Sequence, residues 1–329
     1  MFAFPETTSG VLVFAAAFFY FHLLVIPNAA GVYGFFSRKL IADIQARVGP
    51  NRTGPLGGLQ GFADATKLFF QWGGSKNRNI VFYAYTASLF SVFAALPLGL
   101  GFVFVQSELN ILLPFISLLV LCFFKILESG DQSEIENTLI GFRNGFIALS
   151  AFVPALCSLL IPCVISGKMD WESIIRIQGA APHHWFGVSS PFGVLGALTF
   201  LVSGMILFQM PPFAVGVREK KKYNSSGLII FEMSRFYGFF VWCILTVALF
   251  FGGAGIPVPE GENSFLYSHT QVLVTVLKSG LIWVLIQIFG KTIPAIRVER
   301  ITDFIWKFVF PAALIALIGS VFWTVGFVR

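Results

Sequence analysis

The chain is poor in charged residues and lacks any motif that would hold a metal or a nucleotide. Only 12% of its 329 residues are charged, whereas soluble domains carry about 25%. Its four cysteines lie inside apolar runs and form no CxxC pair, so neither a disulfide framework nor a metal site is expected. These cysteines are Cys122, Cys157, Cys163 and Cys243. With 56% hydrophobic residues, the composition excludes a soluble globular protein and indicates a membrane protein.

Two further absences narrow the class of membrane protein. The start, MFAFPETTSG, has no basic residues of the kind that open a secretory signal, so the first apolar run is predicted to stay as a span. No internal repeat is visible, which disfavours an inverted-repeat carrier. The net charge of +6 does not indicate nucleic acid, because the basic residues stand in loops beside apolar runs.

About eight apolar runs are long enough to cross a bilayer, which takes about 20 residues. They predict an all-α membrane protein formed by a single integral domain, residues 1–329. The predicted spans are Val11–Phe36, Ile80–Val105, Asn110–Leu127, Gly141–Ser166, Phe192–Met210, Gly227–Phe251, Val272–Gly290 and Trp306–Val328.

The basic residues gather on one side of these spans. If the amino terminus is outside, 17 of the 22 Lys and Arg residues lie in or beside inner loops, so both termini are expected outside. The inner loops 37–79 and 211–226 are then cytoplasmic, and the second of them is short and basic. The outer loop 167–191 predicts an amphipathic surface helix, with Trp171 and Trp185 at the level of the lipid headgroups.

His183 and His184 are neighbours in that outer loop. Adjacent side chains are expected to point apart on a helix or a strand, and no third ligand stands at a metal-binding spacing. An ordinary polar rim is therefore expected here, and no metal.

The segment Arg38–Gln71, called here the first-loop segment, is polar and rich in turns between two apolar runs. Apolar residues at helical spacing predict a short amphipathic helix that leaves the first span and is broken by Gly49-Pro50. A second amphipathic helix is expected over Leu59–Phe70. A solvated basic loop that only sets topology would explain the charges, but the density of Gly and Pro favours a specified backbone path.

The first-loop segment resembles the signature of a known family. Its pattern R-K-L-I-A-x-I-Q-x-R-x-G-P-N-R-x-G-P-x-G-x-L-Q-x-x-A-D-A-x-K-L is similar to that of the H subunit of NADH-quinone oxidoreductase, the respiratory complex I. The last inner loop follows the same family in order and spacing, through Lys291-Thr292-Ile293-Pro294, Arg297, Glu299, Trp306-Lys307 and Pro311. The resemblance thus covers nearly the whole chain.

The resemblance implies a subunit without redox centres of its own that anchors the peripheral electron-transfer arm and forms much of a quinone chamber. It implies a redox-driven translocase in the bacterial inner membrane, with quinone as substrate and no nucleic acid. Other subunits and lipid are the expected partners, and FMN and iron–sulfur clusters are expected in partner subunits only. A quinone needs an apolar slot and polar groups near its headgroup. The candidate lining, docking and backbone-shaping residues are Arg38, Gln45, Arg47, Gly49, Pro50, Asn51, Arg52, Gly54, Asp64, Lys67, Arg297 and Glu299.

The chain departs from this family at several charged positions. Intramembrane carboxylates usually serve ion or proton relay, so their loss implies a weakened or rerouted proton path. The loop centred on Arg218–Lys222 is shorter and basic where the family's is acidic, and it predicts contact with anionic lipid or an acidic partner surface. The replacements are Ser37, Phe152, Leu207 and Ala214 for acids and Met210 for an arginine.

The charges singled out within or at the ends of spans are Arg143, Glu232, Arg235 and Lys278. Glu232 and Arg235 stand three residues apart on one helical face and are expected to pair. Glu232 is also the expected partner of Lys278. A neutralised pair that holds helices together is favoured over a substitute proton route.

Two other functions remain open from the sequence. The first is the homologous anchor subunit of a membrane-bound hydrogenase or of a ferredoxin-coupled relative, which also loses carboxylates. The second is a stand-alone secondary transporter, which is disfavoured because no pair of broken helices appears in matched halves of the chain.

Overall fold

The computed structural model describes residues 20, 26–70, 87, 96–98, 108–130, 135–213, 225–255 and 264–327. Over these residues the chain is helical and has no strand, which confirms the all-α prediction. The longer helices are α2 (Ile26–Ile44), α3 (Gln60–Phe70), α5 (Leu112–Gly130), α6 (Ile135–Ser166), α9 (Pro191–Leu207), α10 (Ser225–Phe250), α11 (Ser264–Thr292) and α13 (Phe310–Phe327). The shorter ones are η2 (Pro55–Gly57), α7 (Trp171–Gln178), η3 (Pro182–His184), α8 (Phe186–Ser189), α12 (Val298–Phe304) and the π-helical turn η5 (Ile305–Val309).

Three helical stretches in the described part of the chain are long and apolar enough to cross a membrane. They are Phe142–Ser166, His269–Thr292 and Val298–Gly326. Two shorter apolar helices, Pro191–Leu207 and Arg235–Phe250, match the fifth and sixth predicted spans. Most of the first two predicted spans lies outside the described residues. The total of eight therefore stays a prediction.

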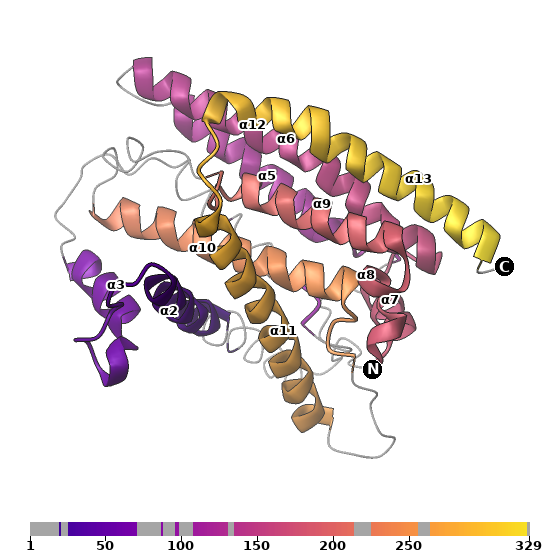
Figure 1. The fold of residues 1–329 in the computed structure, drawn as a ribbon, viewed down its shortest axis with the longest axis horizontal. Helices are drawn as coiled ribbons and strands as arrows, with labels where there is room; N and C mark the ends of the chain where they lie inside the picture. Colours follow the sequence, from indigo (N-terminus) through magenta and orange to yellow (C-terminus); the bar gives the residue numbers. More distant parts are fainter. Residues whose placement is uncertain are drawn as a thin grey trace, which may run out of the picture.

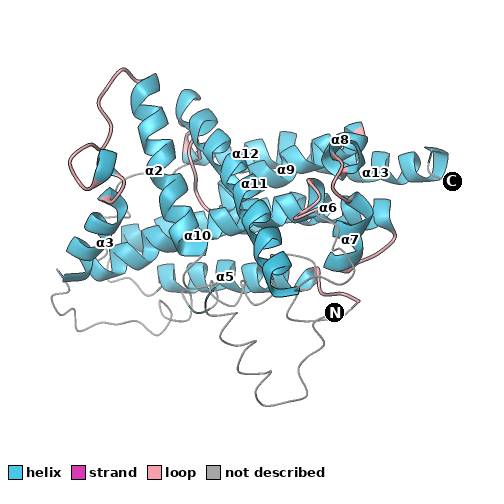
Figure 2. Cartoon of the chain, turned by 90° about the horizontal axis from the view of Figure 1, so that it is seen from below, coloured by secondary structure: helices cyan, strands magenta, loops and turns pink. Residues whose placement is uncertain are grey.

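The long helices α5, α6, α9 and α13 form a layer, and α10 and α11 lie below this layer in the view of Figure 1. α6 packs against α5, α9 and α13, and α10 contacts α9 next to this layer (Figure 1). α11 crosses α10 at a steep angle and also packs on α2 (Figure 1). Seen from below, α2 and α3 lie at one end of the molecule, and α7 and α8 lie towards the opposite end (Figure 2). The first-loop segment and the outer loop, which the sequence assigns to opposite sides of a membrane, are thus far apart.

An aromatic cluster lies where α5, α6, α9 and α10 meet. The rings of Phe200 and Trp242 stack with centroids 4.4 Å apart, and Phe115 lies 6.0 Å from Phe152 and 5.8 Å from Trp242. Gly204 permits this stacking, because a Cβ there would overlap the indole of Trp242. All four aromatic side chains are buried. Between helices in lipid such rings contribute through close van der Waals packing and through ring–ring contacts, each worth about 0.5–1.5 kcal/mol.

The helix that leads into the first-loop segment differs from the expectation. It runs without a break from Ile26 to Ile44 and ends before Gly49-Pro50, so the prediction that this dipeptide breaks it is wrong. The backbone ends the helix here: the N–H of Arg47 donates to Ala42 O at 2.9 Å, and Ala46 adopts φ +52°. A left-handed residue at this point turns the chain away from the helix axis.

The outer loop contains the expected helix, α7, but Trp171 does not lie at a membrane surface. Its side chain is fully buried, and its indole N–H donates to Asn110 O at 3.2 Å. Its backbone N–H also donates to Asn110 Oδ1 at 3.0 Å. The helix begins with a side-chain cap from Asp170, whose carboxylate accepts from Ser173 N. Trp171 therefore joins α7 to the start of α5.

Candidate functional site

The first-loop segment follows a backbone path that glycine makes possible. After α2 the chain reaches Pro50 and then folds back through a tight turn at Gly54 and Gly57, with φ of +70° and +83°. Gly57 is buried against Pro50, and a Cβ there would overlap the carbonyl of Pro50. Leu59 N–H donates to Thr53 O at 3.2 Å and closes the turn before α3 begins. The turn therefore depends on a residue without a side chain at Gly57.

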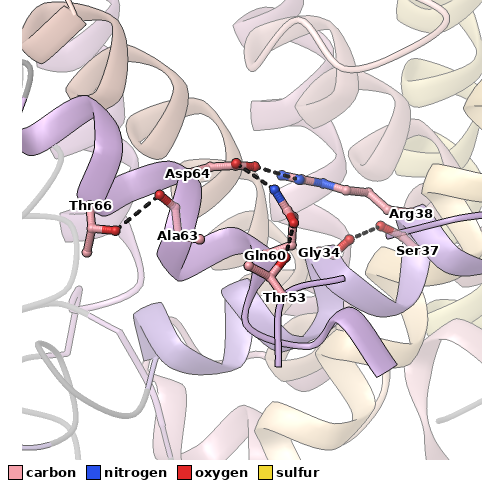
Figure 3. Close-up of polar contacts among 8 residues, drawn as sticks. All are labelled: Gly34, Ser37, Arg38, Thr53, Gln60, Ala63, Asp64 and Thr66. Carbon is pink, nitrogen blue, oxygen red and sulfur yellow. Dashed lines mark hydrogen bonds and ion pairs between the residues drawn. The ribbon is translucent and has the colours of Figure 1, made fainter. Parts of the chain in front are cut away.

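A chain of polar contacts joins α2, this turn and α3 (Figure 3). Arg38 Nη1 lies 3.6 Å from Asp64 Oδ2, and Gln60 Nε2 donates to Asp64 Oδ1 at 2.8 Å. The hydroxyl of Thr53 in turn donates to Gln60 Oε1. Arg38 and Asp64 are both about half exposed, so their ion pair contributes at most about 1 kcal/mol. The network lies where α3 packs against α2.

A hollow of about 430 Å³ opens beside this network. Lys39 at its edge donates from Nζ to Leu56 O at 3.3 Å, and its ammonium lies 5.6 Å from the ring centroid of Phe35. The hollow is lined by Lys39, Asp43, Ala46, Arg47, Val48, Gly49 and Asn51. It thus combines two cations, one carboxylate, one amide and apolar surface.

The hollow brings together only some of the candidate residues. Arg47, Gly49 and Asn51 line it, and Arg38 and Asp64 lie in the adjacent network. The remaining candidates of the first-loop segment are not in its lining: Gln45, Pro50, Arg52, Gly54 and Lys67. Arg297 and Glu299, at the start of α12, are exposed and are not in it either.

Sequence reasoning missed Lys39 and Asp43 as lining residues. Lys39 and Asp43 are four residues apart, which places them on one side of α2, and Arg47 follows just beyond the end of that helix. That spacing could have identified them.

The junction Phe208–Phe213, which follows α9, is tightly packed. The guanidinium of Arg235 is buried and donates to Phe208 O at 3.2 Å and Gln209 O at 2.6 Å. Ile296 N–H donates to Pro212 O at 3.1 Å, which ties the last inner loop to the junction. Leu207 and Met210 are buried in it. Ala214 and the basic residues 218–222 lie outside the described residues, and so does the side chain of Glu232, so its pairing with Arg235 stays a prediction.

Lys278 has partners other than the expected one. Its ammonium donates to Phe251 O at 3.1 Å and Gly253 O at 2.9 Å, and it lies 4.3 Å from the ring centroid of Trp185. Glu232 lies in the second turn of α10, about 27 Å along the helix from Phe250 at 1.5 Å per residue. The predicted Lys278–Glu232 pair is therefore wrong. Arg143 on α6 is exposed.

The two adjacent histidines lie closer together than expected. Their ring centroids are 4.1 Å apart on the short turn η3, because a 3₁₀ turn does not direct neighbouring side chains to opposite faces here. Both are exposed. In the described part of the chain no three His, Cys, Asp or Glu residues gather as a metal site would require.

Comparison with known proteins shows which family the chain resembles. The family model described as NADH dehydrogenase matches residues 16–321. The H subunit of NADH-quinone oxidoreductase from Anaeromyxobacter dehalogenans is 25% identical, over 90% of this chain and 78% of that protein. The H subunit from Rubrobacter xylanophilus is 27% identical, over 90% of this chain and 91% of its own length. The first H subunit of Rhodopseudomonas palustris is 26% identical, over 90% and 92% respectively.

Proposed function

The chain belongs to the NADH dehydrogenase family as an H-type membrane subunit of NADH-quinone oxidoreductase, and we propose that it anchors the peripheral electron-transfer arm and lines the quinone chamber of a complex-I-type ion translocase. As such a subunit it is part of an oxidoreductase complex. The bacterial inner membrane is its proposed location. Quinone is the proposed substrate, while FMN and iron–sulfur clusters belong to the proposed partner subunits. Other membrane subunits, the arm and lipid are the proposed partners.

The observation that carries this proposal is the hollow beside the Arg38–Asp64 network. A quinone headgroup accepts hydrogen bonds through its carbonyl oxygens, and the hollow offers donors from Lys39, Arg47 and Asn51. Beside them runs a row of exposed apolar side chains with the same four-residue spacing, Phe36, Leu40, Ile44 and Val48. Adjacent polar and apolar surfaces along the end of α2 and the turn that follows it suit an amphipathic ligand. The same exposed row would be covered by a docked partner.

Arg47→Gln is expected to raise the KM for quinone by about tenfold, the effect of losing one charge-assisted hydrogen bond worth about 1.5 kcal/mol. The change keeps a polar side chain that can hydrogen-bond, but it shortens the side chain and removes its charge. The measurement is quinone reduction by the purified whole complex over a range of quinone concentrations, together with the amount of peripheral arm that copurifies.

Lys168→Gln serves as the matched control, because Lys168 is an exposed cation in the outer loop. It is expected to leave the KM and the arm unchanged. Loss of the arm at unchanged KM in Arg47→Gln would assign Arg47 to docking alone. No effect on either quantity would remove Arg47 from the proposed site.

We infer a weakened or rerouted proton path from buried positions at which this chain has other residues in place of the acids expected from the family. Phe152 is part of the aromatic cluster, Leu207 is buried at the end of α9, and the hydroxyl of Ser37 is buried and donates to Gly34 O. None of these side chains can bind and release a proton near neutral pH. A carboxylate relay through these positions is therefore excluded.

The purified complex is expected to translocate fewer protons per quinone reduced than its acid-bearing relatives, and Glu232→Gln is expected to leave that ratio unchanged. The reason is that a single acid cannot replace the missing series. Proton uptake into proteoliposomes, divided by quinone reduced, gives the ratio. A ratio equal to that of the relatives, abolished by Glu232→Gln, would show instead that Glu232 is a relay.

A further inference from the structure

Leu56, in the turn between α2 and α3, has a backbone conformation that leucine rarely adopts. Its φ is +55° and its ψ is +17°, in the left-handed region that residues with a Cβ occupy only at a cost. Gly54 and Gly57 on either side also have positive φ, but without that cost. Among the described residues, Ala46 and Gln209 are the other two with a side chain and positive φ. A leucine in this conformation has to be held there by its surroundings.

The surroundings hold the backbone of Leu56 and leave its side chain free. Lys39 Nζ on α2 donates to Leu56 O at 3.3 Å. The N–H groups of the two residues that follow Leu56 each donate to the carbonyl three positions back, at 3.2 and 3.0 Å. None of these contacts uses the side chain of Leu56. The turn therefore fixes the direction in which this side chain leaves the backbone.

The side chain of Leu56 is 71% exposed, although the sequence places its loop on the aqueous inner side. In both views the loop between α2 and α3 lies at the edge of the molecule (Figures 1 and 2). Val48, 86% exposed, and Leu59 are two further exposed apolar side chains of the same loop. An exposed leucine alone is ordinary. One that is held exposed in a costly backbone conformation indicates a role outside the subunit.

A shaped pocket on a protein suits this geometry better than lipid does. Lipid is fluid and adapts to a side chain in any orientation, so it selects no single backbone conformation. The centre of a protein interface is packed as closely as a protein interior, so it requires its anchoring side chain in one position. A side chain that already has its bound conformation loses less freedom on binding. The fixed turn around Leu56 provides this condition.

We propose that Leu56 is the anchor residue for the peripheral arm and fills an apolar pocket on one of the soluble arm subunits. Val48 and Leu59 are the exposed apolar side chains that the same partner surface covers. A few buried anchors of this kind carry most of the binding energy of an interface. The inference rests on the proposed function, because the arm is the proposed partner.

Leu56→Asn tests the anchor in the whole purified complex. Asparagine adopts positive φ more readily than leucine, so the turn is kept while the apolar side chain is lost. The complex is diluted in steps, and the masses of single particles give the concentration at which half of them have lost the arm. This half-dissociation concentration is expected to rise about thirtyfold, the loss typical of removing an anchor residue. The KM for quinone of the intact complex is expected to stay at the wild-type value.

Two further variants of Leu56 separate binding from folding. Leu56→Gly removes the side chain and the backbone cost together, so this chain is expected to reach at least its wild-type abundance in the membrane. It is also expected to raise the half-dissociation concentration about thirtyfold. Leu56→Met keeps an apolar side chain of similar volume and is expected to stay within about threefold of the wild type.

Leu109→Asn is the matched control, because Leu109 is an exposed leucine in the turn before α5, which the sequence places on the outer side. It is expected to keep the wild-type half-dissociation concentration. An unchanged concentration in both Leu56→Asn and Leu56→Gly would overturn the proposal. A raised KM for quinone with the arm retained would place Leu56 in the quinone chamber and would also overturn it. A wild-type complex that carries no arm would instead refute the proposed function.

Discussion

Replacing Gly57 with valine is expected to abolish retention of the peripheral arm and quinone reduction by the complex. The φ of +83° at this residue costs a residue with a Cβ about 1–2 kcal/mol. The added side chain would also collide with the carbonyl of Pro50, so the backbone next to the hollow has to move. The measurements are the fraction of arm subunits that copurify with this chain and the rate of quinone reduction in the same sample.

Gly61→Ala is the matched control in the same segment. Gly61 lies in α3, and a Cβ there meets nothing within 4 Å. Alanine is expected to keep the arm and to stabilise α3 by about 0.5–1 kcal/mol. Full retention of the arm by Gly57→Val would show that the turn is not part of the docking surface.

Arg235→Leu is expected to destabilise the membrane subunit strongly. It leaves the carbonyl groups of Phe208 and Gln209 buried without this donor, at about 1–3 kcal/mol for each. The junction would then loosen from α10 and from the last inner loop, which it meets through Pro212 and Ile296. The measurement is the temperature at which half of the detergent-solubilised complex aggregates, expected to fall by several degrees.

Arg176→Leu is the control for this change. Arg176 is an exposed arginine on α7 whose contact with Glu172, at 3.9 Å, is a surface ion pair. Such pairs contribute at most about 1 kcal/mol, so the aggregation temperature is expected to stay close to that of the wild type. Equal temperatures for Arg235→Leu and the wild type would show that the junction does not depend on the guanidinium.

The helical class and the family were accessible from residue order alone. Apolar runs of about 20 residues have only one stable form in lipid, in which each backbone group is satisfied within its own segment. That constraint made α5, α9 and α10 predictable to within a few residues. The signature from Arg38 onward was equally readable, because its glycines and prolines occupy fixed offsets.

Helix ends and side-chain partners were harder to predict from the sequence. The end of α2 depends on a left-handed residue at Ala46, which carries no sequence signal, since alanine favours helix. Trp171 was expected at a surface because tryptophan is common there. Its burial depends on Asn110, 61 residues away, which accepts from both its N–H groups.

The charged residues show most clearly what the sequence predicts and what only the folded structure reveals. The sequence by itself determined that few charges remain among the spans, that the basic residues gather in loops, and that several of the family's acids are missing. Only the tertiary structure decided where the remaining charges act: Lys278 on two carbonyls and Trp185, Arg235 on the end of α9, and Arg38 on Asp64. The physical reason is that hydrophobicity is a property of each residue, whereas a charge is stabilised by whichever dipoles the crossing of helices brings within about 3–4 Å.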